Sequence, residues 1–453
     1  MYDDTIAAIA TPIGEGGIGV IRVSGKEAKP IASRVFSRAL EHRRLSYGEV
    51  RDPEDGSLVD EVMVTYMQAP RSYTREDMVE VYGHGGPVAL QRILKTLLRC
   101  GARPANPGEF TLRAFLNGRI DLAQAEAVLD VIRAKTDAGL RIAIDGLQGR
   151  LSEPLKALRK DLMELLAYLT ARIDFPEDDV QAQDALTPLR KAREDIAQLI
   201  ASADTGIIYR QGVRVAIVGS PNVGKSSLLN RLLGQSRAIV TPIPGTTRDT
   251  VEEVVNIQGI PFVLVDTAGI TDTADVVENL GIERSRDAVA RSDLVLLVLD
   301  LSQPLTEEDT AIMEQVENRS AGSRWGRSVV AVANKCDLPA EMTLNELPWE
   351  PVRTSMVTGE GLEGLQEKMV EAVLEGRAVT SDALLVSNPR HKAALERAQE
   401  HLAQADESLV RGMPDDFVTI DLTAALNALG EITGETVTEE LLETIFSRFC
   451  IGK

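Results

Sequence analysis

The spacing of apolar residues divides the chain into two kinds of segment. In the first kind, leucine and alanine recur every three or four positions, which places them on one face of an amphipathic helix. Such stripes are formed by Leu155, Leu158, Leu162, Leu165 and Leu169, and again by Leu395, Ala398, Leu402, Ala405 and Leu409. A further helix is predicted from about Leu186 to Ala203. Long helices that pack on one another are therefore expected on both sides of the middle of the chain.

In the second kind of segment, short apolar runs predict β-strands. The N-terminal part contains such runs at Thr5–Ala10, Val20–Val23, Glu61–Met67 and Met78–Tyr82, and then an apolar helix at Val88–Leu98. Strands and helices in this mixture, over an ordinary domain length, predict an α+β domain. We assign residues 1–118 to it.

Three more apolar runs lie in the middle of the chain, and each ends at a polar motif. They are Val213–Val218, Phe262–Val265 and Val329–Ala333. Because helical segments of one style flank this region, we interpret the chain as one helical domain that carries an inserted α/β domain, an arrangement that folds tolerate where chain ends lie close together. The expected boundaries are residues 119–211 and 377–453 for the helical domain and 212–376 for the insertion.

The first of these polar motifs has the spacing of a phosphate-binding loop. It reads Gly219-Ser220-Pro221-Asn222-Val223-Gly224-Lys225-Ser226 and lies between a predicted strand and a predicted helix. Glycines let backbone N–H groups converge on phosphate oxygens, and the helix N-terminus adds a favourable partial charge. Lys225 would reach the outer phosphates and Ser226 would ligate Mg²⁺. We expect nucleotide contacts from Asn222, Val223, Gly224, Lys225, Ser226 and Ser227.

The other two motifs predict which nucleotide is bound. Asp266 and Gly269 end the second run, where a carboxylate and a glycine amide can serve Mg²⁺ and the γ-phosphate. Asn334-Lys335-Cys336-Asp337 ends the third run. Asp337 would accept hydrogen bonds from guanine N1 and its exocyclic amine, a donor pair that adenine lacks. These spacings resemble the GTPase superfamily and imply a Ras-like α/β domain that binds GTP.

Composition and charge exclude some classes of protein but do not predict a specific function. The chain has 453 residues, is 44% hydrophobic and carries a formal net charge of −20. This acidity argues against a dedicated nucleic-acid binder, which usually shows a basic footprint. Three well-separated cysteines suggest no disulfide framework, and no apolar run reaches membrane-spanning length. We expect a cytoplasmic protein without stable membrane insertion.

Several further motifs, taken with the GTPase motifs, resemble those of one family, the MnmE (TrmE) family of bacterial tRNA-modification GTPases. They are the segment from Thr5 to Gly25, Gly83-His84-Gly85-Gly86-Pro87, Pro107-Gly108-Glu109-Phe110, Arg113-Ala114-Phe115-Leu116-Asn117-Gly118, Asp121-Leu122-Ala123-Gln124-Ala125-Glu126 and the terminal Cys450-Ile451-Gly452-Lys453. The resemblance covers essentially the whole chain. The combination of this N-terminal domain with the Cys-x-Gly-Lys end is the specific part.

The resemblance implies a function and a set of partners. Members of the family form a homodimer and join the protein MnmG (GidA), which carries FAD and uses NADH, in a heterotetramer. Together they install an aminomethyl or carboxymethylaminomethyl group on C5 of the wobble uridine of certain tRNAs. The carbon comes from a tetrahydrofolate derivative, in 5-formyl or methylene form, and GTP hydrolysis is required. Which tRNAs are substrates, and whether ammonium or glycine gives the amine, stays open.

The resemblance also carries a folate site to this chain. Its positions map to Arg22, Glu80, Arg119 and Lys453, with Arg119 standing where some members have lysine. A carboxylate can accept from the amide-like edge of a pterin, and cations can hold a glutamate tail. From the residues alone, Arg22, Glu80 and Arg119 would be interpreted as solvated surface charges.

The catalytic arrangement of the GTPase domain differs from that of Ras-like enzymes. A glutamine that orients water usually follows Asp-x-x-Gly, but here Ile270 occupies that place. By resemblance the water-positioning group maps to Glu278, which would otherwise be interpreted as a solvated loop charge. Thr247 maps to the Mg²⁺-binding threonine of switch I. The guanine-base loop maps to Ser355 and Met356, where Ser-Ala is usual.

Family members use K⁺ in place of an arginine finger, held when two GTPase domains meet. By resemblance the K⁺ ligands map to the Asn222 side chain and to backbone oxygens of Thr241, Ile243 and Thr246. A carbonyl-rich loop with one amide suits a large, weakly hydrated cation. Asn222 could instead only shape the turn.

Cys450 is the second candidate catalytic residue, beside Glu278. Activation of C5 of a uridine commonly needs a nucleophile that adds at C6, and a thiolate suits this step. Two alternatives stay open: Cys450 packs between helices, or MnmG supplies the nucleophile.

At the level of function, a ribosome-assembly GTPase is the alternative, because such proteins share the Pro-Asn-x-Gly-Lys-Ser loop. They usually carry an RNA-binding module or a second GTPase domain, and neither is visible in this sequence.

Overall fold

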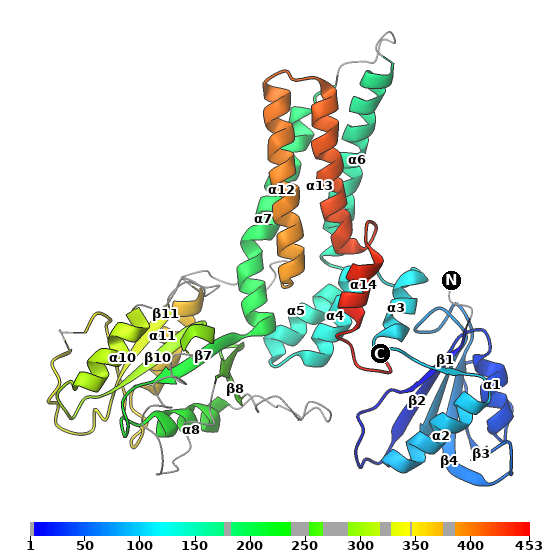
Figure 1. The fold of residues 1–453 in the computed structure, drawn as a ribbon, viewed down its shortest axis with the longest axis horizontal. Helices are drawn as coiled ribbons and strands as arrows, with labels where there is room; N and C mark the ends of the chain where they lie inside the picture. The colour runs from blue at the N-terminus through cyan, green and yellow to red at the C-terminus, as the bar shows by residue number, and fades with distance from the viewer. Residues whose placement is uncertain are drawn as a thin grey trace.

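The computed structural model describes residues 4–175, 183–236, 253–265, 289–317, 328–344, 347–374 and 386–453. It contains an N-terminal sheet unit, a tall helical bundle and a second sheet unit (Figure 1). The base of the bundle, with α4 and α5, lies between the two sheet units. The chain therefore has the predicted fold class, an α+β unit, a helical unit and an inserted α/β unit.

The N-terminal unit is a six-stranded sheet in the order β3-β4-β5-β2-β1-β6. Its elements are β1 (Ile6–Ile9), β2 (Gly19–Ser24), α1 (Ala28–Val35), β3 (Leu45–Arg51), β4 (Leu58–Met67), β5 (Met78–Gly83), α2 (Pro87–Arg99) and β6 (Arg103–Pro104). Neighbouring strands are antiparallel except β1 and β6. Helices α1 and α2 bury one face of the sheet, where Ile31, Ile93 and Leu97 meet Val23 and Val81.

The helical unit is assembled from two parts of the sequence. It contains α4 (Leu122–Arg133), α5 (Asp137–Leu147), α6 (Ser152–Asp174), α7 (Leu186–Gln211), α12 (Pro389–Val410) and α13 (Asp415–Thr433). Both predicted leucine and alanine stripes point into its core, which joins Leu158 and Leu162 of α6 to Leu395 and Leu402 of α12. The prediction that one helical domain flanks an insertion is thereby confirmed.

The inserted unit is a second six-stranded sheet, in the order β12-β11-β10-β7-β9-β8. Its elements are β7 (Val213–Val218), α8 (Lys225–Ser236), β8 (Glu253–Ile257), β9 (Ile260–Leu264), β10 (Leu294–Asp300), α10 (Glu307–Glu317), β11 (Ser328–Asn334), β12 (Val352–Arg353) and α11 (Leu362–Leu374). All neighbouring strands are parallel except β8 and β9. The carboxyl ends of β7 and β11 therefore lie along one edge, where ligands bind in such sheets.

Helix α7 extends beyond the sequence prediction, which ended it near Ala203. It continues to Gln211 and stops at Gly212, whose φ of 84° a non-glycine residue rarely adopts. The extra turns are stabilised by burial, because Ile208 packs in the core of the inserted sheet unit against Val213 and Phe262. Tertiary packing thus carries the helix beyond its predicted end. No helix among the described residues is both long enough and apolar enough to cross a membrane.

Two shorter helices complete the arrangement, α3 (Glu109–Leu116) and α14 (Glu439–Phe446). They pack together beside α4, where Phe446 and Phe449 join Ala114, Leu122 and Leu129 in one apolar cluster. This cluster holds the end of the chain against the N-terminal sheet unit, and Figure 1 shows the C-terminus there.

Candidate functional site

The predicted phosphate loop forms a tight turn between β7 and α8. A Cβ at Gly219 would lie 2.1 Å from the Val298 carbonyl oxygen, and one at Gly224 would lie 2.2 Å from Asn334 Nδ2. Gly219, Asn222 and Gly224 all have positive φ angles, 153°, 63° and 103°. Backbone turned in this way directs successive N–H groups into a concave nest that suits phosphate. The glycine spacing is therefore required by both the close approaches and the backbone angles.

The side chains of the loop hold it in shape. Lys225 Nζ donates to the carbonyl oxygens of Gly219 and Ser220, at 2.8 and 2.7 Å. Ser220 Oγ donates to Asp309 Oδ1 at 2.5 Å. Lys225 and Ser226 open α8, so the cation and the hydroxyl stand at a helix N-terminus. This donor set fits a nucleotide phosphate chain with Mg²⁺ at the Ser226 hydroxyl.

The predicted base-recognition motif is joined directly to the phosphate loop. Asn334 Nδ2 donates to the Val223 carbonyl oxygen at 2.7 Å, and both residues are buried. Lys335 Nζ pairs with Asp300 Oδ2 at 2.6 Å. Burial opposes ionisation of Asp300, but Lys335 and the hydrogen bonds from Ser302 together hold the pKa of Asp300 below its usual value. Asp337 is exposed, three residues after the end of β11.

The segment mapped to the guanine-base loop lies beside the Asn334-Lys335-Cys336-Asp337 motif. Ser355 and Met356 are buried, and Arg231 of α8 donates to the Met356 carbonyl oxygen at 2.9 Å. Ser355 Oγ accepts from the N–H groups of Val357 and Thr358. The Met356 side chain, which is larger than the usual alanine, packs into the core of the sheet unit. The loop therefore accommodates it and keeps its backbone hydrogen bonds.

Eight of the residues named from the sequence lie outside the described residues. They are Thr241, Ile243, Thr246, Thr247, Asp266, Gly269, Ile270 and Glu278. Their proposed roles in Mg²⁺ binding, K⁺ binding and hydrolysis stay predictions.

The four mapped folate positions gather at a second site, on the face of the N-terminal sheet opposite α1 and α2. Arg22 of β2 and Glu80 of β5 are cross-strand neighbours, and Arg22 Nε donates to Glu80 Oε1 at 2.9 Å. Tyr82 donates to the other oxygen of Glu80 at 2.5 Å. Burial, and then the hydrogen bond to Glu80, raises the pKa of Tyr82 to about 12. Tyr82 therefore stays a protonated donor to Glu80 well into the alkaline range.

An aromatic ring that sequence reasoning missed connects these groups to Arg119. The Tyr73 ring lies 4.4 Å from the Arg119 guanidinium carbon and 5.5 Å from that of Arg22. The Tyr73 hydroxyl is hydrogen-bonded to Thr111 at 2.9 Å. A tyrosine in a loop carries no motif, so its position became visible only when the loop between β4 and β5 was placed.

The end of the chain supplies the last mapped residue, Lys453. The N–H of Phe110 at the start of α3 donates to the Lys453 carbonyl oxygen at 3.2 Å, and Arg22 Nη1 donates to that of Gly452 at 3.4 Å. Burial, and then the nearby positive charge of Arg22, lowers the pKa of Lys453. Cys450 is exposed beside this site. The exposure contradicts the alternative that Cys450 packs between helices.

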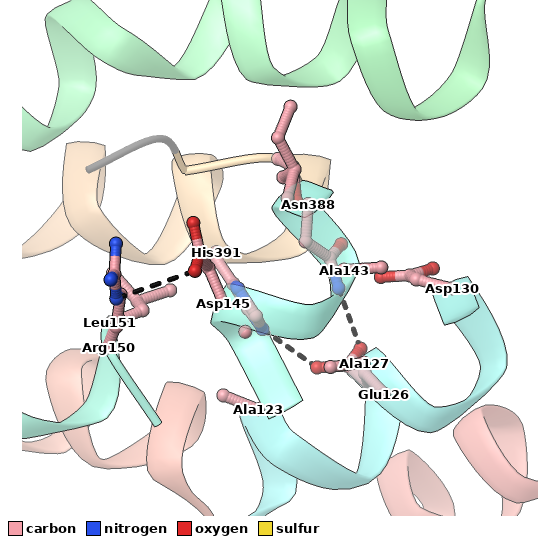
Figure 2. Close-up of a pocket in the computed structure, with 13 residues that line it drawn as sticks. Ala123, Glu126, Ala127, Asp130, Ala143, Asp145, Arg150, Leu151, Asn388 and His391 are labelled. Atoms are coloured by element: carbon pink, nitrogen blue, oxygen red, sulfur yellow. Dashed lines mark hydrogen bonds and ion pairs between the residues drawn. The ribbon is translucent and has the colours of Figure 1, made fainter. Parts of the chain in front are cut away.

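A buried polar cluster, also missed from the sequence, lies at the base of the bundle (Figure 2). Glu126 of α4 accepts from Asn388 at 2.9 Å, from His391 at 2.7 Å and from Arg390 at 2.5 Å. Glu126, Asn388 and His391 line a cavity of about 240 Å³ together with Asp130. Figure 2 shows Asn388 and His391 pointing at Glu126 from the start of α12. We call Glu126, Asn388, Arg390 and His391 the junction cluster.

Electrostatics of the junction cluster follow from its burial. Burial opposes ionisation of Glu126, but His391 and Arg390 more than offset it and hold its pKa well below the usual range. Burial lowers the pKa of His391, and the Glu126 carboxylate, 2.7 Å from His391 Nε2, opposes this shift. Beside the cluster, Asp130 pairs with Arg210 of α7 at 2.7 Å, although burial raises the pKa of Asp130.

A parallel sheet with a glycine-constrained phosphate loop, tied to an Asn-Lys-x-Asp motif, defines a P-loop protein of the G-domain class. Here that domain is inserted into a helical unit whose partner is an N-terminal sheet unit. Residues 5–119 match the family described as "GTP-binding protein TrmE N-terminus", and residues 122–450 match the "MnmE helical domain". The chain belongs to the MnmE family.

Individual relatives agree with this assignment over their whole length. The chain is 52% identical over 461 residues to "tRNA modification GTPase MnmE" of Chloroflexus aurantiacus, with complete coverage of both chains. It is 49% identical over 470 residues to the protein of that name from a Roseiflexus species, again with complete coverage. Among solved structures, the G domain of the T. maritima FeoB iron transporter is 32% identical, with a TM-score of 0.26, and covers 35% of this chain and 98% of its own.

Proposed function

We propose that this protein is the GTP-hydrolysing subunit of a complex that modifies C5 of the wobble uridine of certain tRNAs. One observation carries the proposal: the last residues of the chain dock at the N-terminal sheet, so that Arg22, Glu80, Lys453 and the exposed Cys450 surround one site. The same chain carries the phosphate loop. The full-length relatives named as tRNA modification GTPases support it.

In the proposed nucleotide site, Asp337 selects guanine and the loop from Asn222 to Ser227 holds the phosphates. Bound Mg²⁺, with Ser226 and Thr247 as protein ligands, neutralises phosphate charge. Asn222 would ligate K⁺ with backbone oxygens of Thr241, Ile243 and Thr246, and Glu278 would position water. Asn222 fits this role in its exposure and its left-handed backbone, which turns the residue out of the loop.

In the proposed folate site, Glu80 accepts from the amide-like edge of the pterin, while Arg22, Arg119 and Lys453 balance anionic groups. Arg22 is already oriented by its pair with Glu80, and Arg119 by the Tyr73 ring. Both guanidinium groups are thus held in place before a ligand arrives, which lowers the entropy lost on binding.

We further propose that the Cys450 thiolate adds to C6 of the uridine, which makes C5 nucleophilic towards the one-carbon unit. Loss of the C5 proton then expels the thiolate and restores the C5–C6 double bond. The alternative, that MnmG supplies this nucleophile, would leave Cys450 to shape the folate site. Exposure of Cys450 beside Lys453 supports a chemical role.

The partners proposed are a second copy of this chain, MnmG with its FAD and NADH, and tRNA. The proposed domains are residues 1–118 for folate binding and dimerisation, 119–211 and 377–453 for the helical domain, and 212–376 for GTP hydrolysis.

The test is a reconstituted reaction with MnmG, tRNA, tetrahydrofolate donor and GTP, read by nucleoside analysis. Cys450→Ser should keep folate binding and GTP hydrolysis and lose modification. Full modification by the serine variant would remove Cys450 as the nucleophile. Failure of the wild-type protein to modify tRNA would overturn the proposed function itself.

A further inference from the structure

One short segment, residues 133–136, contacts both the G domain and the C-terminal tail, by which we mean residues 447–453, after α14. Arg133 Nη2, at the end of α4, donates to the Arg448 carbonyl oxygen at 2.8 Å. Thr136 Oγ1, at the N-cap of α5, donates to the Gly259 carbonyl oxygen at 2.8 Å. A G-domain contact and a tail contact are therefore separated by a single turn of chain, between α4 and α5.

On the G-domain side, the contact is with the turn that joins β8 to β9. Gln258 and Gly259 have φ angles of 51° and 87°, and a Cβ at Gly259 would lie 3.0 Å from Ala138 Cβ in α5. The two strands are antiparallel neighbours, so they move as one ribbon. Strand β9 also pairs with β7, which leads into the phosphate loop. The turn is thus one of the parts of the nucleotide-binding sheet that contact the helical unit, beside the packing of Ile208 against β9.

On the tail side, Arg448 precedes the exposed Cys450 by two positions. Phe449 between them is buried against Phe446, with ring centroids 5.4 Å apart. Arg133 therefore holds the backbone immediately before Phe449, the buried residue that anchors this part of the chain. A shift of Arg133 would move this anchor and, with it, the residues that follow.

Helix α4 is held firmly enough to transmit such a shift rather than absorb it. Asp121 and Gln124 close its N-terminus with a reciprocal capping box. Asp130 pairs with Arg210 at the end of α7, and Glu126 is fixed by the junction cluster. Arg210 Nη1 also donates to the Ser387 carbonyl oxygen at 3.3 Å, where the chain returns from the G domain. Figure 1 shows α4 and α5 between the two sheet units.

We propose that Arg133 is a positioning residue for the Cys450 tail, and that Thr136 makes this position depend on the β8–β9 ribbon of the G domain. The nucleotide bound to the G domain would then set the placement of Cys450. The role of the tail in modification rests on the proposed function above. The coupling of nucleotide to tail does not, since it can be read from the thiol alone.

The experiment measures the alkylation rate of Cys450 by iodoacetamide in the full-length protein, with GDP or with a non-hydrolysable GTP analogue. Peptide mass spectrometry separates Cys450 from the buried Cys100 and the half-buried Cys336. Wild-type rates should differ at least about twofold between the nucleotides. In Arg133→Ala this difference should disappear, while GTP hydrolysis stays within about twofold, since the Arg133 hydrogen bond is to the tail and not to the nucleotide site.

Matched variants separate positioning from general damage. Arg448→Ala should behave as wild type, because Arg133 bonds the backbone of Arg448, and Arg133→Lys should restore the response. Thr136→Asp keeps the acceptor that caps α5 at Gly139 but cannot donate to Gly259. It should lose the nucleotide response, and Thr136→Ser should keep it. Circular dichroism melts confirm that each variant is folded.

The outcomes are distinct. The coupling is overturned if the wild-type alkylation rate of Cys450 is the same with either nucleotide. It is also overturned if Arg133→Ala keeps the wild-type difference between the nucleotides. Loss of the response in Arg448→Ala as well would show general loosening of the tail and would also overturn it. A wild-type protein that shows the response yet modifies no tRNA would leave the coupling standing and reject the proposed function instead.

Discussion

Replacement of Glu126 by glutamine should destabilise the helical unit strongly. The carboxylate accepts from Asn388 and His391 and twice from Arg390, at distances between 2.5 and 3.1 Å. Hydrogen bonds to charged groups are worth about 1.5–3 kcal/mol each, but neighbours are not additive. Removal of one partner of a buried ion pair costs about 3–5 kcal/mol in total, because the remaining charge is uncompensated. The amide nitrogen of glutamine would face donors only.

Differential scanning calorimetry at pH 7 is the assay. For a unit of this size, about 3–5 kcal/mol corresponds to a fall of roughly 6–20 °C in the midpoint of the helical-unit transition. Glu164→Gln is the matched control, since Glu164 is 69% exposed and its pair with Lys160 is 3.8 Å long. In Glu164→Gln the free energy of unfolding should change by no more than about 0.5 kcal/mol, so the transition midpoint should shift only slightly.

The pH dependence gives an independent check on the same residue. Because the folded-state pKa of Glu126 lies below its ordinary value of 4.5, the carboxylate contributes its stability fully above that pH and loses it as pH falls. The gap between wild type and Glu126→Gln should narrow by about 1.4 kcal/mol for each pH unit below 4.5. A midpoint unchanged within 2 °C at pH 7 (on the order of 1 kcal/mol), or a gap that widens in acid, would refute the reasoning.

Four further predictions concern the two sites. Asp337→Asn should shift nucleotide preference from GTP to xanthosine triphosphate in competition binding, and retained GTP affinity would exclude Asp337 as the base reader. Glu278→Ala should slow hydrolysis by orders of magnitude with GTP affinity nearly intact; an unchanged rate would return Glu278 to a solvated loop. Hydrolysis should be faster in KCl than in NaCl at equal ionic strength, and Asn222→Ala should abolish the difference; equal wild-type rates would remove K⁺ from the mechanism. Gly452→Ala, whose Cβ would lie 2.4 Å from the Ile9 carbonyl oxygen at a φ of 93°, should weaken folate binding at least tenfold in calorimetric titrations, whereas Ile451→Ala should not.

The sequence predicted those structural features that depend on residues close together in the chain. The phosphate loop, its flanking strand and helix, and both leucine stripes follow from residues close together in sequence, and the structure has all of them. The charges mapped to the folate site depended on the family resemblance. By composition alone Arg22 and Glu80 would be placed in solvent, yet their strands are neighbours and the two side chains pair.

What the sequence could not predict depends on contacts between distant segments. Glu126 and His391 are 265 positions apart, so nothing near Glu126 marks it as buried. The docking of the tail onto β1 and α3 likewise joins the two ends of the chain. Helix α7 passes its predicted end because the G-domain core covers Ile208. In each case the deciding term is burial against a partner that the local sequence does not contain.

The way in which the G domain is attached has a mechanical consequence. Helix α7 leads into the G domain at Gln211, and the described part of the helical unit resumes at Val386 beside the same helix, since a Cβ at Gly206 would lie 2.3 Å from the Val386 carbonyl oxygen. Attachment at one place lets a rigid body rotate about that place without stretching its support. The Thr136–Gly259 hydrogen bond lies close to this attachment, since a Cβ at Gly259 would lie 3.5 Å from Cε1 of Tyr209, near the end of α7. This contact therefore braces the hinge itself, so that a rotation of the G domain must first strain or break it.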